Sequence, residues 1–149
     1  MKLYLQISII LNFLYLNVTF SQQENSKFYI TELRGDISLE MEINNLQSNN
    51  GPLYIRILDE NENPVIVGTS LVFNYSSRIS FDSIFPGKYA IQFFHDENEN
   101  QKMDFNLIGI PKEKFGSSND VKPVLGPPKF EKMLFNLTED KKIIMIPVN

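Results

Sequence analysis

The chain has 149 residues, 42% of them hydrophobic, and its 14 Lys and Arg against 18 Asp and Glu give a formal net charge of −4. This length and apolar fraction fit one globular domain and exclude a disordered chain. Because cysteine is absent and His95 is the one histidine, disulfides, thiolate zinc sites, iron–sulfur clusters and sites with several His ligands are also excluded. The acidic balance argues against nucleic acid as a partner.

The first 21 residues are expected to form a secretory signal peptide. Lys2 precedes an uncharged run over residues 3–20, and the small residues Thr19 and Ser21 stand at the −3 and −1 positions of a cleavage after Ser21. A retained membrane anchor is the alternative, but a spanning helix needs ~20 strongly apolar residues, and polar side chains interrupt this run. The sequence therefore predicts a secreted or periplasmic protein with no membrane anchor after cleavage.

Residues 22–35 are expected to be a linker or an edge segment, and residues 36–149 the folded domain. From residue 37 to residue 43, apolar and polar residues alternate, which predicts a half-buried strand. Residues 53–58 alternate in the same way after a turn rich in Asn, Ser and Gly. The short run 64–67 begins with a proline, which cannot donate to a central ladder, so we expect this run at a sheet edge.

Further strands are predicted in the second half of the chain. Ile79 and Phe81 mark one of them, and another follows a Pro-Gly corner. In that second strand, four side chains are expected to share one face: Tyr89, Ile91, Phe93 and His95. Residues 130–137 and 142–148 are expected to form a last pair, separated by a polar turn.

Helical periodicity is absent after Ser26, and at most residues 111–115 form one helical turn. About seven short strands between Gly, Pro, Asn and Asp turns predict an all-β fold, an antiparallel Greek-key β-sandwich of immunoglobulin- or transthyretin-like type. A closed small barrel is the alternative, which periodicity does not separate from a sandwich. Tyr89, just after the Pro-Gly corner, is typical of a tyrosine corner, whose buried ring offers its hydroxyl to a nearby backbone group.

An acidic, asparagine-rich loop follows the strand that ends at His95, and oxygen-bearing side chains recur in it at alternate positions. Asp96, Asn98, Asn100 and Asp104 occupy places 1, 3, 5 and 9 of an EF-hand-like calcium loop, and the carbonyl of Lys102 occupies place 7. A curled loop can converge such oxygens on one hard cation. These five residues are the candidate metal ligands, and calcium is the candidate cofactor.

Two positions depart from the calcium-loop pattern. Gln101 stands where a sharp turn favours Gly, and Leu107 stands where a bidentate Glu closes the shell. A carboxylate from elsewhere must then complete the site, and Glu113 and Asp120 are the nearest candidates. Calcium affinity is accordingly expected in the weak range of ~0.1–1 mM.

A polar turn that caps its own backbone is the alternative interpretation of this loop. The same five residues, Asp-Glu-Asn-Glu-Asn, occur again at residues 59–63. There Pro64 follows and place 9 carries no Asp, so the repeated motif alone does not establish a cation site.

Several of these motifs together resemble a known family. The segments are Pro86-Gly87-Lys88-Tyr89-Ala90-Ile91, His95-Asp96-Glu97-Asn98-Glu99-Asn100 with Asp104, Gly109-Ile110-Pro111-Lys112-Glu113, and Gly116-Ser117-Ser118-Asn119. Over roughly residues 36–148 the chain resembles the domain-of-unknown-function 2141 (DUF2141) family of secreted, uncharacterised bacterial proteins. The resemblance implies an exported β-sandwich domain and no established activity. The family usually carries Gly at the position of Gln101.

The first functional hypothesis is a non-enzymatic secreted module whose long loop, residues 96–119, binds an ion and a protein or glycan partner. Phe105 and Phe115 could anchor such a partner, or they could cover the open end of the sandwich.

A hydrolase is the alternative hypothesis, with His95 acting beside Asp96 or Asp104 and with Ser117 or Ser118 as nucleophile. The chain lacks a Gly-x-Ser-x-Gly elbow, and nothing in the spacing requires these groups to meet. The matching structural interpretation of His95 is a strand-end residue bonded to a loop carbonyl. A transition-metal carrier built on His95 is the weakest hypothesis, because one imidazole without thiolate or Met partners selects poorly for such ions.

Overall fold

The computed structural model describes residues 26–30, 35–123 and 128–148. The predicted signal peptide, residues 1–21, lies outside these residues. None of the described helices is long and apolar enough to cross a bilayer.

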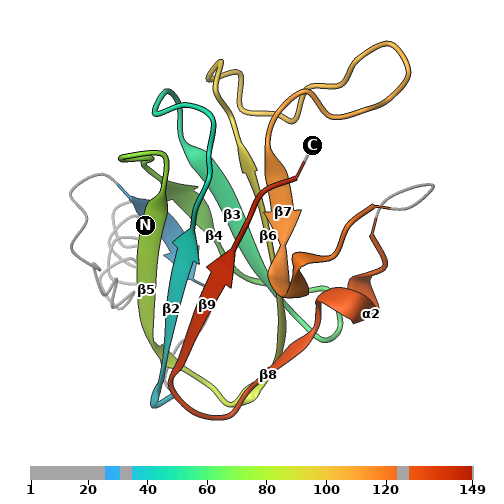
Figure 1. Ribbon diagram of the computed structural model, residues 1–149. Helices are drawn as coiled ribbons and strands as arrows, with labels where there is room; N and C mark the ends of the chain where they lie inside the picture. Colours follow the sequence, from blue (N-terminus) through green and yellow to red (C-terminus); the bar gives the residue numbers. More distant parts are fainter. Residues whose placement is uncertain (1–25, 31–34, 124–127, 149) are drawn as a thin grey trace, which may run out of the picture.

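The described residues form nine strands in two sheets, which Figure 1 shows as two layers. The larger sheet has the order β1 (Lys27–Ile30), β4 (Pro64–Ser70), β3 (Leu53–Asp59), β6 (Gly87–His95) and β7 (Phe115–Ser117), and β8 (Phe135–Leu137) also pairs with β6. The smaller sheet has the order β5 (Ser77–Ile84), β2 (Ile37–Ile43) and β9 (Lys141–Met145). The all-β sandwich predicted from the alternation is confirmed.

The core lies between the two sheets. In β2, the odd-numbered residues from Ile37 to Ile43 are buried and the even-numbered ones are more exposed, as the alternation predicts. In β6, the four side chains predicted to share one face are all buried. The hydroxyl of Tyr89 donates to the carbonyl of Phe85 at 3.0 Å, which confirms the predicted tyrosine corner.

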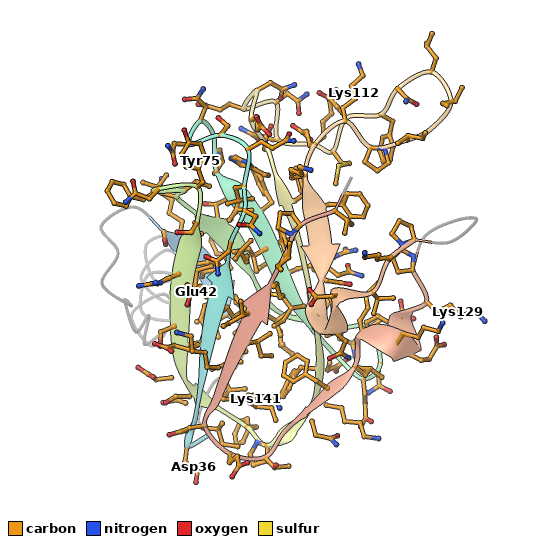
Figure 2. All side chains as sticks on the ribbon, viewed as in Figure 1. Asp36, Glu42, Tyr75, Lys112, Lys129 and Lys141 are labelled. Carbon is orange, nitrogen blue, oxygen red and sulfur yellow. The ribbon has the colours of Figure 1, made fainter. Side chains whose placement is uncertain are left out.

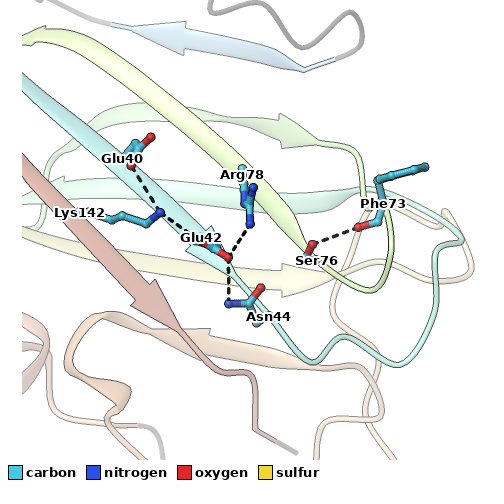
Figure 3. Close-up of polar contacts among 7 residues, drawn as sticks. All are labelled: Glu40, Glu42, Asn44, Phe73, Ser76, Arg78 and Lys142. Carbon is cyan, nitrogen blue, oxygen red and sulfur yellow. Dashed lines mark hydrogen bonds and ion pairs between the residues drawn. The ribbon is translucent and has the colours of Figure 1, made fainter.

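Charged side chains link the three strands of the smaller sheet (Figure 3). Glu42 on β2 lies 3.1 Å from Arg78 on β5 and 3.0 Å from Lys142 on β9. Hydrogen bonds from Lys142, then from Arg78, lower the pKa of the Glu42 carboxyl. Lys142 lies on β9, which pairs in parallel with β2. This pairing differs from the prediction, which was an antiparallel sandwich.

Two strand predictions were wrong in their pairing. The strand that begins at Pro64 is internal, because β1 pairs with its outer side from residue 66 to residue 69. Pro64 is tolerated there as the first residue of β4, where the ladder begins. The last two predicted strands do not pair with each other, because β8 joins β6 in the larger sheet and β9 crosses to β2 in the smaller one.

Helical structure is confined to single turns among the described residues. These are the 3-10 turn η1 (Ser118–Asp120) and the α-helical turn α2 (Phe130–Met133), whereas residues 111–115 are not helical and Phe115 begins β7. The absence of a helix at 111–115 agrees with the expectation of at most one helical turn there, and the strand predicted from residue 130 begins only at Phe135.

Candidate cation site at one end of the sandwich

The candidate loop leaves β6 from a buried position at the end of the sandwich. Asp96 is fully buried, and its backbone N–H donates to the carbonyl of Pro52 at 3.0 Å. Gly51 packs against the same peptide with φ at +71°, and a Cβ placed on it would lie 1.9 Å from the Asp96 carbonyl oxygen. The loop that precedes β3 thus fixes the first residue of the candidate site, and only Gly permits this approach.

The carboxylate of Asp96 curls the loop back on itself. Its two oxygens accept the backbone N–H groups of Asn100 at 3.1 Å and of Gln101 at 2.7 Å. Glu99 and Gln101 adopt left-handed backbone conformations, with φ at +59° and +66°. The backbone therefore turns sharply at residue 101 even though the residue is not Gly.

Asp104 closes the loop from its other end. One of its carboxylate oxygens, Oδ2, accepts the side-chain amides of Asn98 at 2.6 Å and of Asn100 at 2.9 Å. The amide oxygen of Asn98 accepts the N–H of Asn100, and that of Asn100 accepts the N–H of Lys102. The structure therefore brings together all five residues predicted from the spacing, in a loop that bonds to itself.

A sixth group reaches this loop from residue 113. The Glu113 side chain is 6% exposed, and its Oε2 accepts the backbone N–H of Asp104 at 3.1 Å. Its other oxygen, Oε1, is buried without a hydrogen-bond partner. Burial raises the pKa of the Glu113 carboxyl, and the negative charges of Asp96 and Asp104 raise it further, while the N–H groups of Asp104 and Glu97 oppose this.

Asp120, the other candidate for completing the site, lies elsewhere. It is exposed at the end of η1, where its carboxylate faces the backbone N–H of Ile146 at 3.4 Å. Of the two carboxylates that the sequence offered, only Glu113 joins the loop.

Carboxylates alone do not make a metal centre here. Among the residues that the structure describes, no group of three or more His, Asp and Glu side chains is arranged to hold a metal ion. A cation would need the amide oxygens of Asn98 and Asn100 and the carbonyl of Lys102 as well. Each amide oxygen has two lone pairs and uses one on a backbone N–H, so one remains for a cation. Calcium accepts such mixed oxygen sets in flexible geometry.

The repeat of the motif at residues 59–63 makes a turn of a different kind. Asp59 accepts the N–H groups of Asn61 and Asn63 at 2.8 Å and the Asn63 side chain at 3.0 Å. The Asn63 side-chain bond lowers the pKa of the Asp59 carboxyl most. Asp59 is capped by its own hairpin turn, whereas Asp96 in the loop after β6 is fully buried and Glu113, with one unpaired oxygen, packs against that loop.

His95 points into the sandwich, as the face shared with Phe93 requires. It is fully buried, and its Nε2 lies 2.8 Å from the carbonyl of Asn50, so Nε2 carries the proton and donates it. Its Nδ1 has no hydrogen bond and lies 3.7 Å from the Glu97 carboxylate. The ring therefore lies at the end of its strand and is bonded to a loop carbonyl, as the structural interpretation of His95 expects.

The two serines of the hydrolase hypothesis do not meet His95. Ser117 is paired with Gln92 in the ladder, on the face of β6 opposite to His95. The Ser118 hydroxyl donates to the carbonyl of Met133 at 2.6 Å and accepts the N–H of Ile91 at 3.0 Å. Ile91 is four residues from His95 along the strand, or about 13 Å.

A groove on the outer face of the larger sheet was not foreseen from the sequence. It has a volume of about 400 Å³, and its lining includes the aromatic residues Tyr54, Phe94 and Phe115 and the methionines Met103 and Met133. Tyr54 and Phe94, from adjacent strands, stack there with ring centroids 5.0 Å apart, and Phe115 lines the same groove. Phe105, in contrast, is 55% exposed. The alternation of inward and outward residues in β3 and β6 could have indicated this groove, because it places both stacked rings on the outward face of the sheet.

Comparison with known proteins gives one family. A family model described as "Uncharacterized protein conserved in bacteria (DUF2141)" matches residues 41–145. No curated protein and no solved structure matches the chain.

Proposed function

Because the chain belongs to the DUF2141 family of uncharacterized bacterial proteins, we propose its function from the site itself: a non-enzymatic exported module that binds one Ca²⁺ in the loop 96–104. Asp96, Asn98, Asn100, Asp104 and the carbonyl of Lys102 supply oxygens, and Glu113 supplies the carboxylate that the loop lacks at place 12.

The observation that carries this proposal is the unpaired Oε1 of Glu113. A buried carboxylate oxygen without a hydrogen-bond partner costs free energy, and this carboxylate stands beside two others. A divalent cation among these three carboxylates would offset two of their three negative charges. Asp104, whose Oδ2 now accepts two amide donors, would exchange them for the ion.

Calcium suits this arrangement better than magnesium. Mg²⁺ requires near-ideal octahedral geometry and retains several waters, whereas Ca²⁺ accepts six to eight oxygens at variable angles. Amide and carbonyl oxygens on a loop with left-handed residues at positions 99 and 101 give that variable geometry.

Thermal unfolding of residues 22–149 tests the proposal, since this segment contains every described strand. After EDTA treatment, about 5 mM Ca²⁺ should stabilise the protein by about 1–2 kcal/mol if Kd is ~0.1–1 mM. This corresponds to a rise in melting temperature of about 4–8 °C. Magnesium at the same concentration should have a smaller effect.

Variants locate the ion. The double variant Asp96→Asn/Asp104→Asn should lose the calcium-induced rise, whatever its own melting temperature. Asp59→Asn is the matched control, because it alters the same motif in the hairpin turn, and it should keep the full rise. The proposal is wrong if calcium shifts no melting temperature, or if the double variant shifts as much as the wild type.

A further inference from the structure

The groove on the outer face of the larger sheet has a floor of two neighbouring rows of side chains. Each row runs across three strands, because the register places its members opposite one another. The polar row consists of Arg56 on β3, Gln92 on β6 and Ser117 on β7. The aromatic row consists of Tyr54, Phe94 and Phe115 on the same three strands. Residues two apart in a strand share a face and lie about 7 Å apart, so the two rows are side by side.

The polar row has hydrogen-bonding capacity that the protein does not use. The Ser117 side chain is 4% exposed, and its hydroxyl has no hydrogen-bond partner. The Gln92 amide donates to the sulfur of Met133 at 3.1 Å, and a thioether is a weak acceptor. A buried hydroxyl without a partner costs free energy, so an oxygen of a ligand on this row would be stabilised by it.

Arg56 gives the polar row a positive charge. Its Nε donates to the side-chain oxygen of Gln92 at 2.6 Å, which fixes the guanidinium beside the amide and leaves its other N–H groups for a ligand. Of the described residues that line the groove, Arg56 alone is charged, and none of the described carboxylates forms an ion pair with it. Lys129, the residue before α2, is exposed and points away from the sheets (Figure 2). Charge complementarity therefore favours a ligand with an anionic group.

The aromatic row favours an aromatic body for this ligand. The rings of Tyr54 and Phe94 are stacked with their planes 9° apart, and Met103 and Met133 contribute two sulfur atoms to the lining. Ring pairs and contacts between Met sulfur and rings stabilise an aromatic molecule beyond the area that it buries, and an aliphatic chain gains neither. The volume of about 400 Å³ lies within the range of ~300–1,000 Å³ for small-molecule sites.

We propose that this groove binds a small aromatic carboxylate. The rings of the ligand lie on the aromatic row. Its carboxylate lies over Gln92 and accepts N–H groups of Arg56 and Gln92 and the hydroxyl of Ser117. The proposal does not rest on the calcium site, since the six residues of the two rows lie outside the loop 96–104.

Fluorescence titration of 2-naphthoate with residues 22–149 tests the proposal, and the chain has no Trp whose emission would interfere. EDTA keeps calcium out of the measurement. The neutral 2-naphthamide has the same rings and tests the charge, whereas octanoate, measured by competition, tests the aromatic body. We expect 2-naphthoate to bind at least about 10-fold more tightly than either of them.

Variants locate the ligand. Arg56→Met should weaken 2-naphthoate binding at least about 10-fold and leave 2-naphthamide binding almost unchanged. Arg78→Met is the matched control, because Arg78 is an exposed arginine on β5 in the other sheet, and it should bind 2-naphthoate like the wild type. Melting temperatures should verify that each variant folds.

Ser117→Ala separates a ligand-binding role from a structural one. It should weaken 2-naphthoate binding at least about 3-fold without lowering the melting temperature, because the hydroxyl bonds to nothing in the free protein. A serine with only a structural role would change stability and leave binding unchanged, and that result would remove Ser117 from the site.

Several results would overturn the proposal. If 2-naphthoate does not bind, or if Arg56→Met binds it as tightly as the wild type, the groove is not a site for this anion. Equal affinity for 2-naphthamide would remove the role of the charge, and equal affinity for octanoate would remove the preference for an aromatic body. Because the titration is performed in EDTA, its failure leaves the calcium proposal standing, and a missing calcium response leaves this one standing.

Discussion

Replacing Glu113 with Gln should stabilise the protein in the absence of calcium and remove its response to calcium. The side chain is 6% exposed, Oε1 has no hydrogen-bond partner, and Asp96 and Asp104 add like charge. Gln keeps the shape and an oxygen for the N–H of Asp104, but it removes the buried charge. Since a buried polar group without a partner costs about 1–3 kcal/mol and the new amide recovers only part of this, we expect a gain of about 1–2 kcal/mol at pH 7.

The gain should depend on pH in a defined direction. The pKa of Glu113 is raised in the folded protein above its ordinary value of 4.5. An acid with a raised pKa destabilises the fold above that pKa, and the penalty disappears as the pH falls below 4.5, where folded and unfolded states are both protonated. The difference between Glu113→Gln and the wild type should therefore be largest at pH 7 and should shrink toward pH 4.

Thermal unfolding followed by circular dichroism measures both effects. In EDTA at pH 7 the variant should melt about 4–8 °C above the wild type. In about 5 mM calcium the wild type alone should rise, which removes or reverses this difference. A variant that is less stable than the wild type in EDTA at pH 7 would refute the reasoning, because Glu113 would then not be an uncompensated charge. A variant with the full calcium response would show that Glu113 is not a ligand.

Three further changes test how the backbone supports the site and the fold. Gln101→Gly should stabilise the protein by up to about 1 kcal/mol in chemical denaturation, because φ at residue 101 is +66°, and it should also tighten calcium binding. Gly51→Ala should destabilise by more than about 2 kcal/mol, since the new Cβ would lie 1.9 Å from the Asp96 carbonyl oxygen. Tyr89→Phe should cost about 1 kcal/mol in denaturant unfolding through the lost bond to the Phe85 carbonyl.

A control separates backbone relief from calcium binding. Glu62 has φ at +65° in the hairpin turn that repeats the motif. Glu62→Gly should therefore give a stability gain like that of Gln101→Gly, with no change in calcium affinity. Equal stability of Gly51→Ala and the wild type would show that residue 51 does not approach Asp96 closely. A Tyr89→Phe variant as stable as the wild type would show that the corner bond contributes nothing.

The sequence predicted the spacing of the oxygen-bearing side chains in the loop after β6, but it did not predict which further carboxylate joins them. Alternate oxygens from Asp96 to Asp104 follow from residue order, and the structure gathers them because the chain between them is short. The third carboxylate was ambiguous, with Glu113 and Asp120 both offered. Only the fold, which returns the chain beside β6 at Phe115, buries Glu113 against the loop and leaves Asp120 at the far end of β7.

Strand existence followed from the sequence, and strand partnership did not. Alternation over residues 37–43 and 87–95 reports which side chains face the core, because neighbouring residues in a strand point to opposite sides. The segment with which a strand forms hydrogen bonds is often distant in the chain, so the local sequence does not identify it. β1 pairs with the strand that begins at Pro64, and β9 pairs in parallel with β2. The local sequence is typical of an edge strand near residue 64 and of a hairpin near residue 141, so it does not predict either pairing.

The sequence by itself determined that this protein is an all-β domain with a tyrosine corner and an acidic loop suited to oxygen coordination, since these features depend on residues a few positions apart. The tertiary structure decided which of the two identical motifs begins with a buried acid, Asp96, and that the distant Glu113 packs against it. Burial and proximity between distant segments arise only when the sheets pack, because desolvation of Glu113 is a property of the assembled structure.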